Sequence, residues 1–257
     1  MPKLERDGVS LNYVEAGTGG PPILLVHCWG GDHSMMAPLL THFSRTHRVI
    51  SPDLRGFGAS SRPEQKYPTA GFADDLVWMC RELGVERPVV IGHSMGGTIA
   101  LELGARPGFA AAVVILEALT VTPPPIVESF RPVLEGIRSP ACMQVLQQFT
   151  EQLLGPHFEA GARARVLELF ARNSPHVLAS SLGELLNYDS AAAAARCKVP
   201  LLYASSGPWF TDVERFRSLA PQLVTSQAVG CGHYFQLEVP EQVNATVERF
   251  LQVYVGR

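Results

Sequence analysis

Short apolar runs alternate along this chain with longer stretches whose apolar residues recur at helical spacing. Helices are predicted over residues 67–83 and 95–105, and a further helix begins near Pro240. The apolar runs are almost unbroken, which is typical of parallel strands buried on both faces. The pattern therefore predicts an α/β fold with a mostly parallel central sheet flanked by helices. The predicted strands cover residues 10–15, 23–27, 48–52, 88–91, 112–116, 199–203 and 224–229.

Residues 122–198 depart from this alternation. Three consecutive prolines, 123–125, break the chain, and several helical stretches follow without an intervening strand. We interpret the segment as a helical cap inserted into one catalytic core. The predicted boundaries are residues 1–121 for the first part of the core, 122–198 for the cap and 199–257 for the second part of the core.

The composition limits the kinds of binding partner to be expected. The chain is 46% hydrophobic and 18% charged with a formal charge of −3, which gives no field strong enough to recruit nucleic acid or an anionic membrane. No signal-peptide core and no apolar run of membrane-spanning length is present, so a soluble cytoplasmic protein is expected. A small, fairly apolar molecule is the expected partner, and a homodimer is left open. The five cysteines show no C-x-x-C pair or zinc spacing, so no metal or cofactor is expected.

The sharpest chemical signal is the motif G-x-S-x-G at residues 92–96. It follows the predicted strand 88–91 and opens the helix that begins at Met95, so Ser94 falls on a tight turn from strand to helix. Such a turn exposes the serine hydroxyl and directs the backbone N–H of Met95 at a developing oxyanion. Ser94 is therefore the predicted nucleophile.

With this motif and two others, the sequence resembles the α/β-hydrolase superfamily, in its compact esterase and lactonase-like branch. Residues 53–60 are similar to the family's D-x-x-G-x-G-x-S turn, which we interpret as structural. Residues 230–233 are similar to the G-x-G-H loop that carries the family's catalytic histidine. The resemblance extends over most of the chain and implies that His233 is the general base of Ser94.

The triad acid departs from the commonest family pattern. Trp209 stands where an Asp would be expected after the strand 199–203, and Asp212 nearby belongs to a T-x-x-E capping box at residues 211–214. Some family members, including haloalkane dehalogenases and zearalenone-type lactonases, supply the acid after the strand that precedes the cap. Glu117 ends that strand here, so we predict Glu117 as the acid, with Asp212, a dyad or an unrecognised acid as alternatives.

The second oxyanion donor is expected in the loop at residues 27–31, which resembles the family's H-G-x motif. The backbone N–H of Trp29 matches that donor, although Cys28 replaces the family's glycine and lacks its freedom at positive φ. His33 and Trp209 are the substrate-pocket candidates.

Together these residues predict a serine hydrolase that cleaves a small, fairly apolar carboxylic ester or lactone through an acyl-enzyme. Two alternatives stay open at this point. One is a cofactor-independent dioxygenase of the same fold, of the kind that acts on hydroxyquinolones. The other is a non-catalytic ligand-binding member, because a fold alone does not fix a function.

Overall fold

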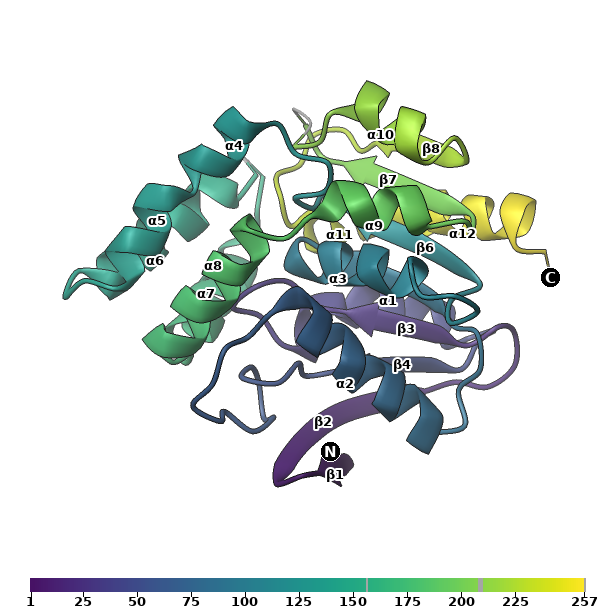
Figure 1. Cartoon of the computed structure of the whole chain (residues 1–257), viewed down its shortest axis with the longest axis horizontal. Coiled ribbons are helices and arrows are strands. Elements are labelled where there is room, and N and C mark those ends of the chain that lie inside the picture. Colours follow the sequence, from purple (N-terminus) through teal and green to yellow (C-terminus); the bar gives the residue numbers. More distant parts are fainter. Residues whose placement is uncertain (156, 208–209, 257) are drawn as a thin grey trace.

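Eight strands form one sheet in the order β1-β2-β4-β3-β5-β6-β7-β8 in the computed structural model, which describes residues 1–155, 157–207 and 210–256 (Figure 1). β1 and β2 are antiparallel to each other, β2 is antiparallel to β4, and all other neighbours are parallel. The predicted α/β fold with a mostly parallel central sheet is confirmed. The strands are β1 (Lys3–Arg6), β2 (Val9–Ala16), β3 (Ile23–Val26), β4 (Val49–Pro52), β5 (Val89–His93), β6 (Ala112–Leu116), β7 (Leu201–Ser205) and β8 (Leu223–Gln227).

Helices cover both faces of the sheet because successive strand residues point to opposite sides. The helices are η1 (His33–Met36), α1 (Ala37–Phe43), α2 (Thr69–Glu82), α3 (Met95–Gly104), α4 (Pro124–Ser129), α5 (Arg131–Ile137), α6 (Cys142–Leu153), α7 (Ala160–Ala171), α8 (Pro175–Leu186), α9 (Ser190–Arg196), α10 (Val213–Leu219), α11 (Phe235–Glu238) and α12 (Pro240–Tyr254). In β3, Leu24 and Val26 join the core beneath α2, α3 and α10, whereas Ile23 and Leu25 join the core beneath α1 and α12.

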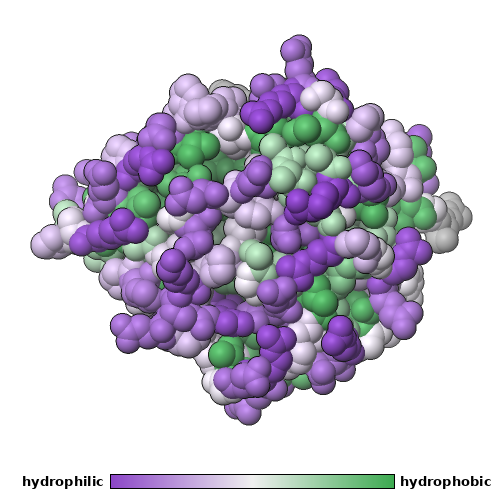
Figure 2. Space-filling view, viewed as in Figure 1, coloured by the Kyte–Doolittle hydropathy of each residue, from purple (hydrophilic) through white to green (hydrophobic). Residues whose placement is uncertain are grey.

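The surface agrees with this burial. On the face drawn in Figure 2 most residues are hydrophilic, and the apolar ones form small, separated patches. Among the helices that the structure describes, none is long and apolar enough to cross a membrane.

The helices between β6 and β7 divide by their contacts. α4 to α8, residues 124–186, lie together at one side of the sheet, and we call them the outer helices (Figure 1). The carboxyl ends of β3 and β7 point toward them. α9 instead packs on α3 and α10, beside the sheet. These contacts would end the cap before α9, whereas the limits 122–198 stay a prediction.

The predicted pattern lacked several short elements, β1 and α11 among them. β1 is polar and pairs with β2 through a two-residue turn in which Asp7 has φ 52° and Gly8 has φ 78°. An Asp-Gly pair of this kind is the signature of a type I′ hairpin, so the sequence did carry the signal. α11 spans only four residues directly after His233. β7 also begins two residues later than predicted, at Leu201.

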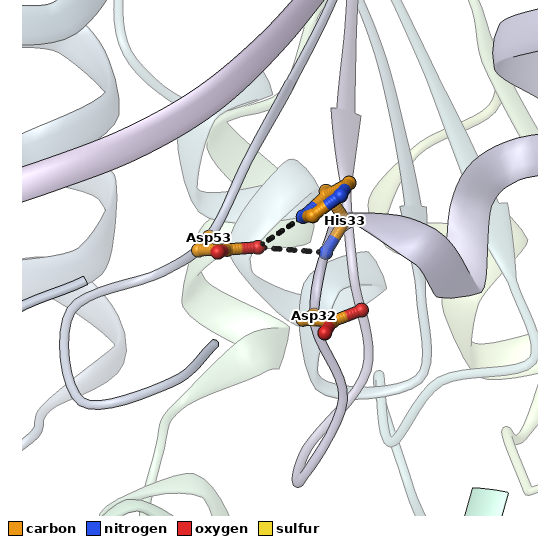
Figure 3. Close-up of side chains that lie close together, drawn as sticks. All are labelled: Asp32, His33 and Asp53. Carbon is orange, nitrogen blue, oxygen red and sulfur yellow. Dashed lines mark hydrogen bonds and ion pairs between the residues drawn. The ribbon is translucent and has the colours of Figure 1, made fainter. Parts of the chain in front are cut away.

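The turn after β4 is closed by the carboxylate of Asp53, which is buried (Figure 3). One oxygen, Oδ1, accepts the backbone N–H and the Nδ1–H of His33, at 2.9 and 2.7 Å. The other oxygen, Oδ2, accepts the N–H of Ala59 at 2.8 Å. A Cβ added at Gly58 would lie 2.3 Å from this carboxylate, so the turn requires a glycine there. The D-x-x-G-x-G-x-S motif thus has a structural explanation.

The ion pair between His33 and Asp53 should make stability depend on pH. The hydrogen bond to Asp53 outweighs burial and raises the pKa of His33. Burial raises the pKa of Asp53, but the His33 ring and the N–H groups of Ala59 and His33 together have a larger, opposite effect. The pKa of Asp53 therefore lies below its ordinary value. The contribution of His33 is complete below the unfolded pKa of about 6.5 and is lost as pH rises through the folded pKa. That of Asp53 is present above about pH 4 and is lost as pH falls through its lowered pKa.

We therefore expect His33→Gln to lower the free energy of unfolding most between about pH 4 and 6.5, by about 1.5–3 kcal/mol, because a hydrogen bond between charged groups is lost. The difference from wild type should shrink at pH 9, where the imidazole is neutral. Urea unfolding at pH 5.5 and pH 9 measures this. Equal effects of His33→Gln at both pH values would contradict the ion pair.

Candidate active site

Ser94 lies on the turn between β5 and α3 with φ 54° and ψ −123°, a strained conformation for a residue with a side chain. Its N–H donates to the carbonyl of Leu116 at 2.9 Å, which continues the pairing of β5 with β6. A Cβ at Gly92 would lie 2.0 Å from the carbonyl oxygen of Gly96, and one at Gly96 would lie 2.2 Å from a carbonyl oxygen of β3. The turn can therefore form only because both positions are glycine.

Glu117 follows β6 in an equally unusual conformation, with φ 44°, and its side chain is buried. Its N–H donates to the carbonyl of Ala204 on β7 at 2.8 Å. Its Oε2 accepts the N–H of Ser206 at 2.7 Å, and its Oε1 lies 3.7 Å from Nδ1 of His233. Burial raises the pKa of Glu117, but the nearby His233 ring and the Ser206 N–H together outweigh it and hold the pKa below its ordinary value. The carboxylate is therefore ionised where it faces the imidazole.

His233 lies in the loop between β8 and α11 and is 9% exposed. Its Nδ1 is buried and has no hydrogen-bond partner among the described residues. The 3.7 Å to Glu117 is the distance of an ion pair, longer than a hydrogen bond. Hydrogen bonds between catalytic groups are often long in unliganded sites and tighten when substrate binds. A small movement of either side chain would satisfy the buried Nδ1–H.

The side chain of His93 holds the backbone of the His233 loop. It is fully buried, and its Nε2–H donates to the backbone carbonyl of His233 at 2.8 Å. Its Nδ1 accepts from Nε2 of Gln236 at 3.1 Å. Burial, together with the neighbouring His233 ring, holds the pKa of His93 well below its ordinary value. His93 is thus a neutral structural histidine, although it stands next to Ser94 in the sequence.

Two backbone N–H groups are free near Ser94. Those of Trp29 and Met95 have no hydrogen-bond acceptor within the part of the chain that the structure describes. Cys28 does not take a positive φ; Gly30 does, at 72°. The loop therefore makes its turn two residues after the position at which the family has glycine.

The side chain of Trp29 joins this loop to the outer helices. Its Nε1–H donates to the carbonyl of Leu178 and to Oγ of Ser181, both at 3.1 Å and both on α8. Its ring meets Phe149 and Phe170 edge to face, with centroids 6.0 and 5.5 Å apart. The indole is thus part of the wall between the core and the outer helices.

One apolar pocket brings the predicted triad together, with an empty volume of about 520 Å³ that includes space open to solvent. No lysine or arginine is found among the described residues that line it. Five of the apolar side chains come from the outer helices, and a sixth, that of Phe130, comes from the junction between α4 and α5. The lining residues are Cys28, Trp29, Ser94, Glu117, Leu119, Phe130, Phe149, Leu153, Phe170, Leu182, Leu185, Phe210, His233 and Tyr234.

Sequence reasoning missed most of this lining. The amphipathic helices identify apolar residues, but which of them face a cavity depends on how the helices pack. Tyr234 could have been suspected, because it directly follows His233.

Other predicted site residues lie elsewhere. His33 does not line the cavity; it borders a separate cleft with Asp32 and Asp53. Trp209 lies outside the described residues. Asp212 caps α10, where its carboxylate accepts the N–H of Arg215 at 3.0 Å. The cap residue is thus Asp212 itself, because the hydroxyl of Thr211 donates to the carbonyl of Thr120 instead.

Asp32, His33 and Asp53 are close enough together to hold a metal ion (Figure 3). Several of their polar atoms already take part in hydrogen bonds within the protein, however. Asp53 accepts from His33 and Ala59 as described, and Oδ1 of Asp32 accepts the N–H and the hydroxyl of Ser34 at 2.9 and 2.6 Å. These contacts explain the cluster as a cap of η1 joined to the β4 turn.

Comparison with known proteins places this geometry in a family. Residues 21–240 match the sequence model of the alpha/beta hydrolase fold family. The 2-hydroxymuconate semialdehyde hydrolase of Pseudomonas putida is 26% identical over 264 residues, covering 95% of this chain and 91% of that protein. An uncharacterised protein of Mycobacterium tuberculosis is 32% identical over 111 residues, which span 40% of this chain but only 30% of that relative.

Solved structures agree in fold. The enol-lactonase from Burkholderia xenovorans LB400 superimposes with a TM-score of 0.88 at 22% identity, over 98% of this chain and 100% of that one. A thermophilic esterase from Thermogutta terrifontis gives a TM-score of 0.85 at 23% identity, over 99% of each chain. The family model matches most of the chain, and the chain superimposes on these solved structures over nearly its whole length. This chain therefore belongs to the alpha/beta hydrolase fold family.

Proposed function

We propose that this hydrolase cleaves a small, uncharged carboxylic ester or lactone through an acyl-enzyme formed on Ser94. The observation that carries the proposal is that Ser94, Glu117 and His233, from three separate parts of the chain, line one apolar cavity. Ser94 adopts the strained turn that exposes a nucleophile, and an ionised carboxylate lies 3.7 Å from Nδ1 of the imidazole.

Each residue has a defined task in this proposal. Nε2 of His233 takes the proton of the Ser94 hydroxyl as that oxygen attacks the acyl carbon, and then returns the proton to the leaving oxygen. Glu117 fixes the tautomer with Nδ1–H and stabilises the imidazolium that forms. Water then attacks the acyl-enzyme. Nε2 of His233 takes a proton from the water and gives it to Oγ of Ser94, which leaves. No other acid among the described residues lines the cavity, so Glu117 is favoured over Asp212.

The free N–H groups of Trp29 and Met95 are proposed as the oxyanion hole. Met95 adds the amino end of α3, whose partial positive charge favours an anion. In an apolar, largely enclosed site such dipoles are far more effective than in water.

The lining favours an uncharged substrate. Besides the proposed catalytic residues and the Cys28 thiol, the described walls are apolar or aromatic, and the indole Nε1–H of Trp29, unlike its backbone N–H, is already bonded to α8. A free carboxylate on the substrate would be buried without a cation to pair with, which is costly. The names of the similar proteins, a lactonase and an esterase among them, support hydrolysis of this bond type. We also propose that the outer helices act as the cap over the cavity.

The first test is Ser94→Ala. This change removes the nucleophile, so kcat/KM for p-nitrophenyl esters and lactones should fall by at least about a thousandfold while the fold is kept. Circular dichroism and thermal unfolding verify the fold. Undiminished turnover in a folded Ser94→Ala protein would overturn the proposal, and oxygen consumption by the wild type would point to the dioxygenase alternative.

The second test concerns charge. p-Nitrophenyl butyrate should be hydrolysed with a kcat/KM about a hundredfold higher than mono-p-nitrophenyl succinate, which is the same acyl length with a terminal carboxylate, because burying that charge unpaired costs several kcal/mol. Steady-state kinetics at low and high salt measure the ratio. Equal or faster turnover of the succinate ester would contradict an uncharged substrate.

The third test separates the two acids. Glu117→Gln should lower kcat by about a thousandfold with little change in KM, since the imidazolium loses its counter-charge. Asp212→Asn should change kcat by less than about threefold, because asparagine caps a helix about as well as aspartate. The two variants are matched carboxylate-to-amide changes. The reverse order of damage would return the acid to Asp212.

A further inference from the structure

The outer helices meet the catalytic loop at one tight junction. The N–H of His233 donates to the carbonyl of Leu153, the last residue of α6, at 2.8 Å. One oxygen of Glu238, Oε1, accepts the N–H of Gly232 at 2.9 Å and that of Gly155 at 3.3 Å. The backbone of the proposed base is thus hydrogen-bonded to the outer helices on one side, and a single carboxylate bridges the two segments on the other.

The glycines of this junction are required by contact. A Cβ at Gly155 would lie 2.0 Å from Oε2 of Glu238 and 2.4 Å from the backbone nitrogen of Gly232. One at Gly232 would lie 2.3 Å from the backbone nitrogen of Gly155. Neither glycine has a positive φ, so an alanine would be conformationally acceptable at both positions. The two segments therefore approach as closely as backbone allows.

The position of Glu238 is energetically unfavourable for one of its carboxylate oxygens. Its Oε2 is buried and has no hydrogen-bond partner in the described ranges 1–155, 157–207 and 210–256. Buried polar atoms are normally satisfied, and one that is not needs an explanation. A plain structural carboxylate would place both oxygens on donors. Here one oxygen serves both segments, which points to a bridging role.

The junction also reaches the substrate cavity from both sides. Leu153 lines the cavity wall on the outer helices, and His233 and Tyr234 line it on the loop. A displacement of the segment 153–155 would therefore move a wall of the cavity and the backbone support of the imidazole together.

We propose that Glu238 is a positioning residue that holds residues 153–155 and 232–233 as one unit, so that His233 is correctly placed only while the outer helices lie over the cavity. This inference rests on the proposed function only for its effect on turnover. A misplacement of about 1 Å in a catalytic group can cost about a hundredfold in rate. The junction would thus couple closure of the site to assembly of its base.

The test uses the full chain with four changes: Glu238→Ala, Glu238→Gln, Gly155→Ala and, as control, Gly183→Ala. Gly183 lies on α8, and the nearest atom to an added Cβ there is 3.7 Å away. Amide hydrogen exchange is measured at His233, whose N–H bonds Leu153 and not Glu238. Its exchange should accelerate by about tenfold or more in Glu238→Ala and in Gly155→Ala, since the unit opens as a whole. Gly183→Ala should match wild type.

Turnover of the neutral ester supplies the second readout. kcat should fall by about 10- to 100-fold in Glu238→Ala and Gly155→Ala, with KM changing less than about threefold. Glu238→Gln keeps an acceptor oxygen for both N–H groups and should restore most of kcat. A merely structural role would lower the melting temperature without this split between kcat and KM.

Unchanged exchange at His233 in both Glu238→Ala and Gly155→Ala would overturn the junction as a unit. Accelerated exchange with wild-type kcat would overturn its role in positioning the base. A wild-type protein without ester turnover would count against the proposed function alone, since hydrogen exchange would still decide whether the junction is one unit. If Glu238→Ala fails to fold, Gly155→Ala and Glu238→Gln decide the same question.

Discussion

The ladder of backbone hydrogen bonds in the parallel sheet is the constraint on which the site depends. It continues one residue past the strand ends: Ser94 donates to Leu116 of β6, and Glu117 donates to Ala204 of β7. Immediately after these bonds the chain can no longer stay extended, and both residues take a positive φ. The sheet therefore fixes the backbone of two proposed catalytic residues directly, and their side chains project from the same edge.

This arrangement stores strain and buried charge in a small volume. Two residues with side chains have a positive φ, and the ionised Glu117 is almost fully buried beside an imidazole whose Nδ1 lacks a hydrogen-bond partner among the described residues. Each feature costs about 1–3 kcal/mol in isolation. The strands β5 and β6 are fully buried, α3 is buried except at Glu102, and their packing offsets these costs. Functional sites commonly concentrate such locally unfavourable features.

The outer helices contribute apolar walls, and their attachment is specific. Trp29 binds α8 through its indole N–H, while Glu238 and the carbonyl of Leu153 bind the loop of His233. Trp29 also supplies a proposed oxyanion N–H, and Leu153 and Glu238 bond to the loop that carries His233. Consequently the core alone does not define the cavity, because its shape and the position of the imidazole depend on where the outer helices lie.

The sequence by itself determined the α/β fold and the elbow around Ser94, because these depend on local pattern: apolar runs and glycines two residues either side of a serine. The loop of His233 and the role of Glu117, which follows a buried strand, were predicted with the help of a family resemblance. Only the tertiary structure decided what lies near them. His33 was predicted for the pocket but binds Asp53 in a separate cleft, and Glu238 carried no local signal at all. Both outcomes depend on contacts between residues far apart in the chain, such as Gly155 with Glu238, which side-chain pattern along a single segment does not encode.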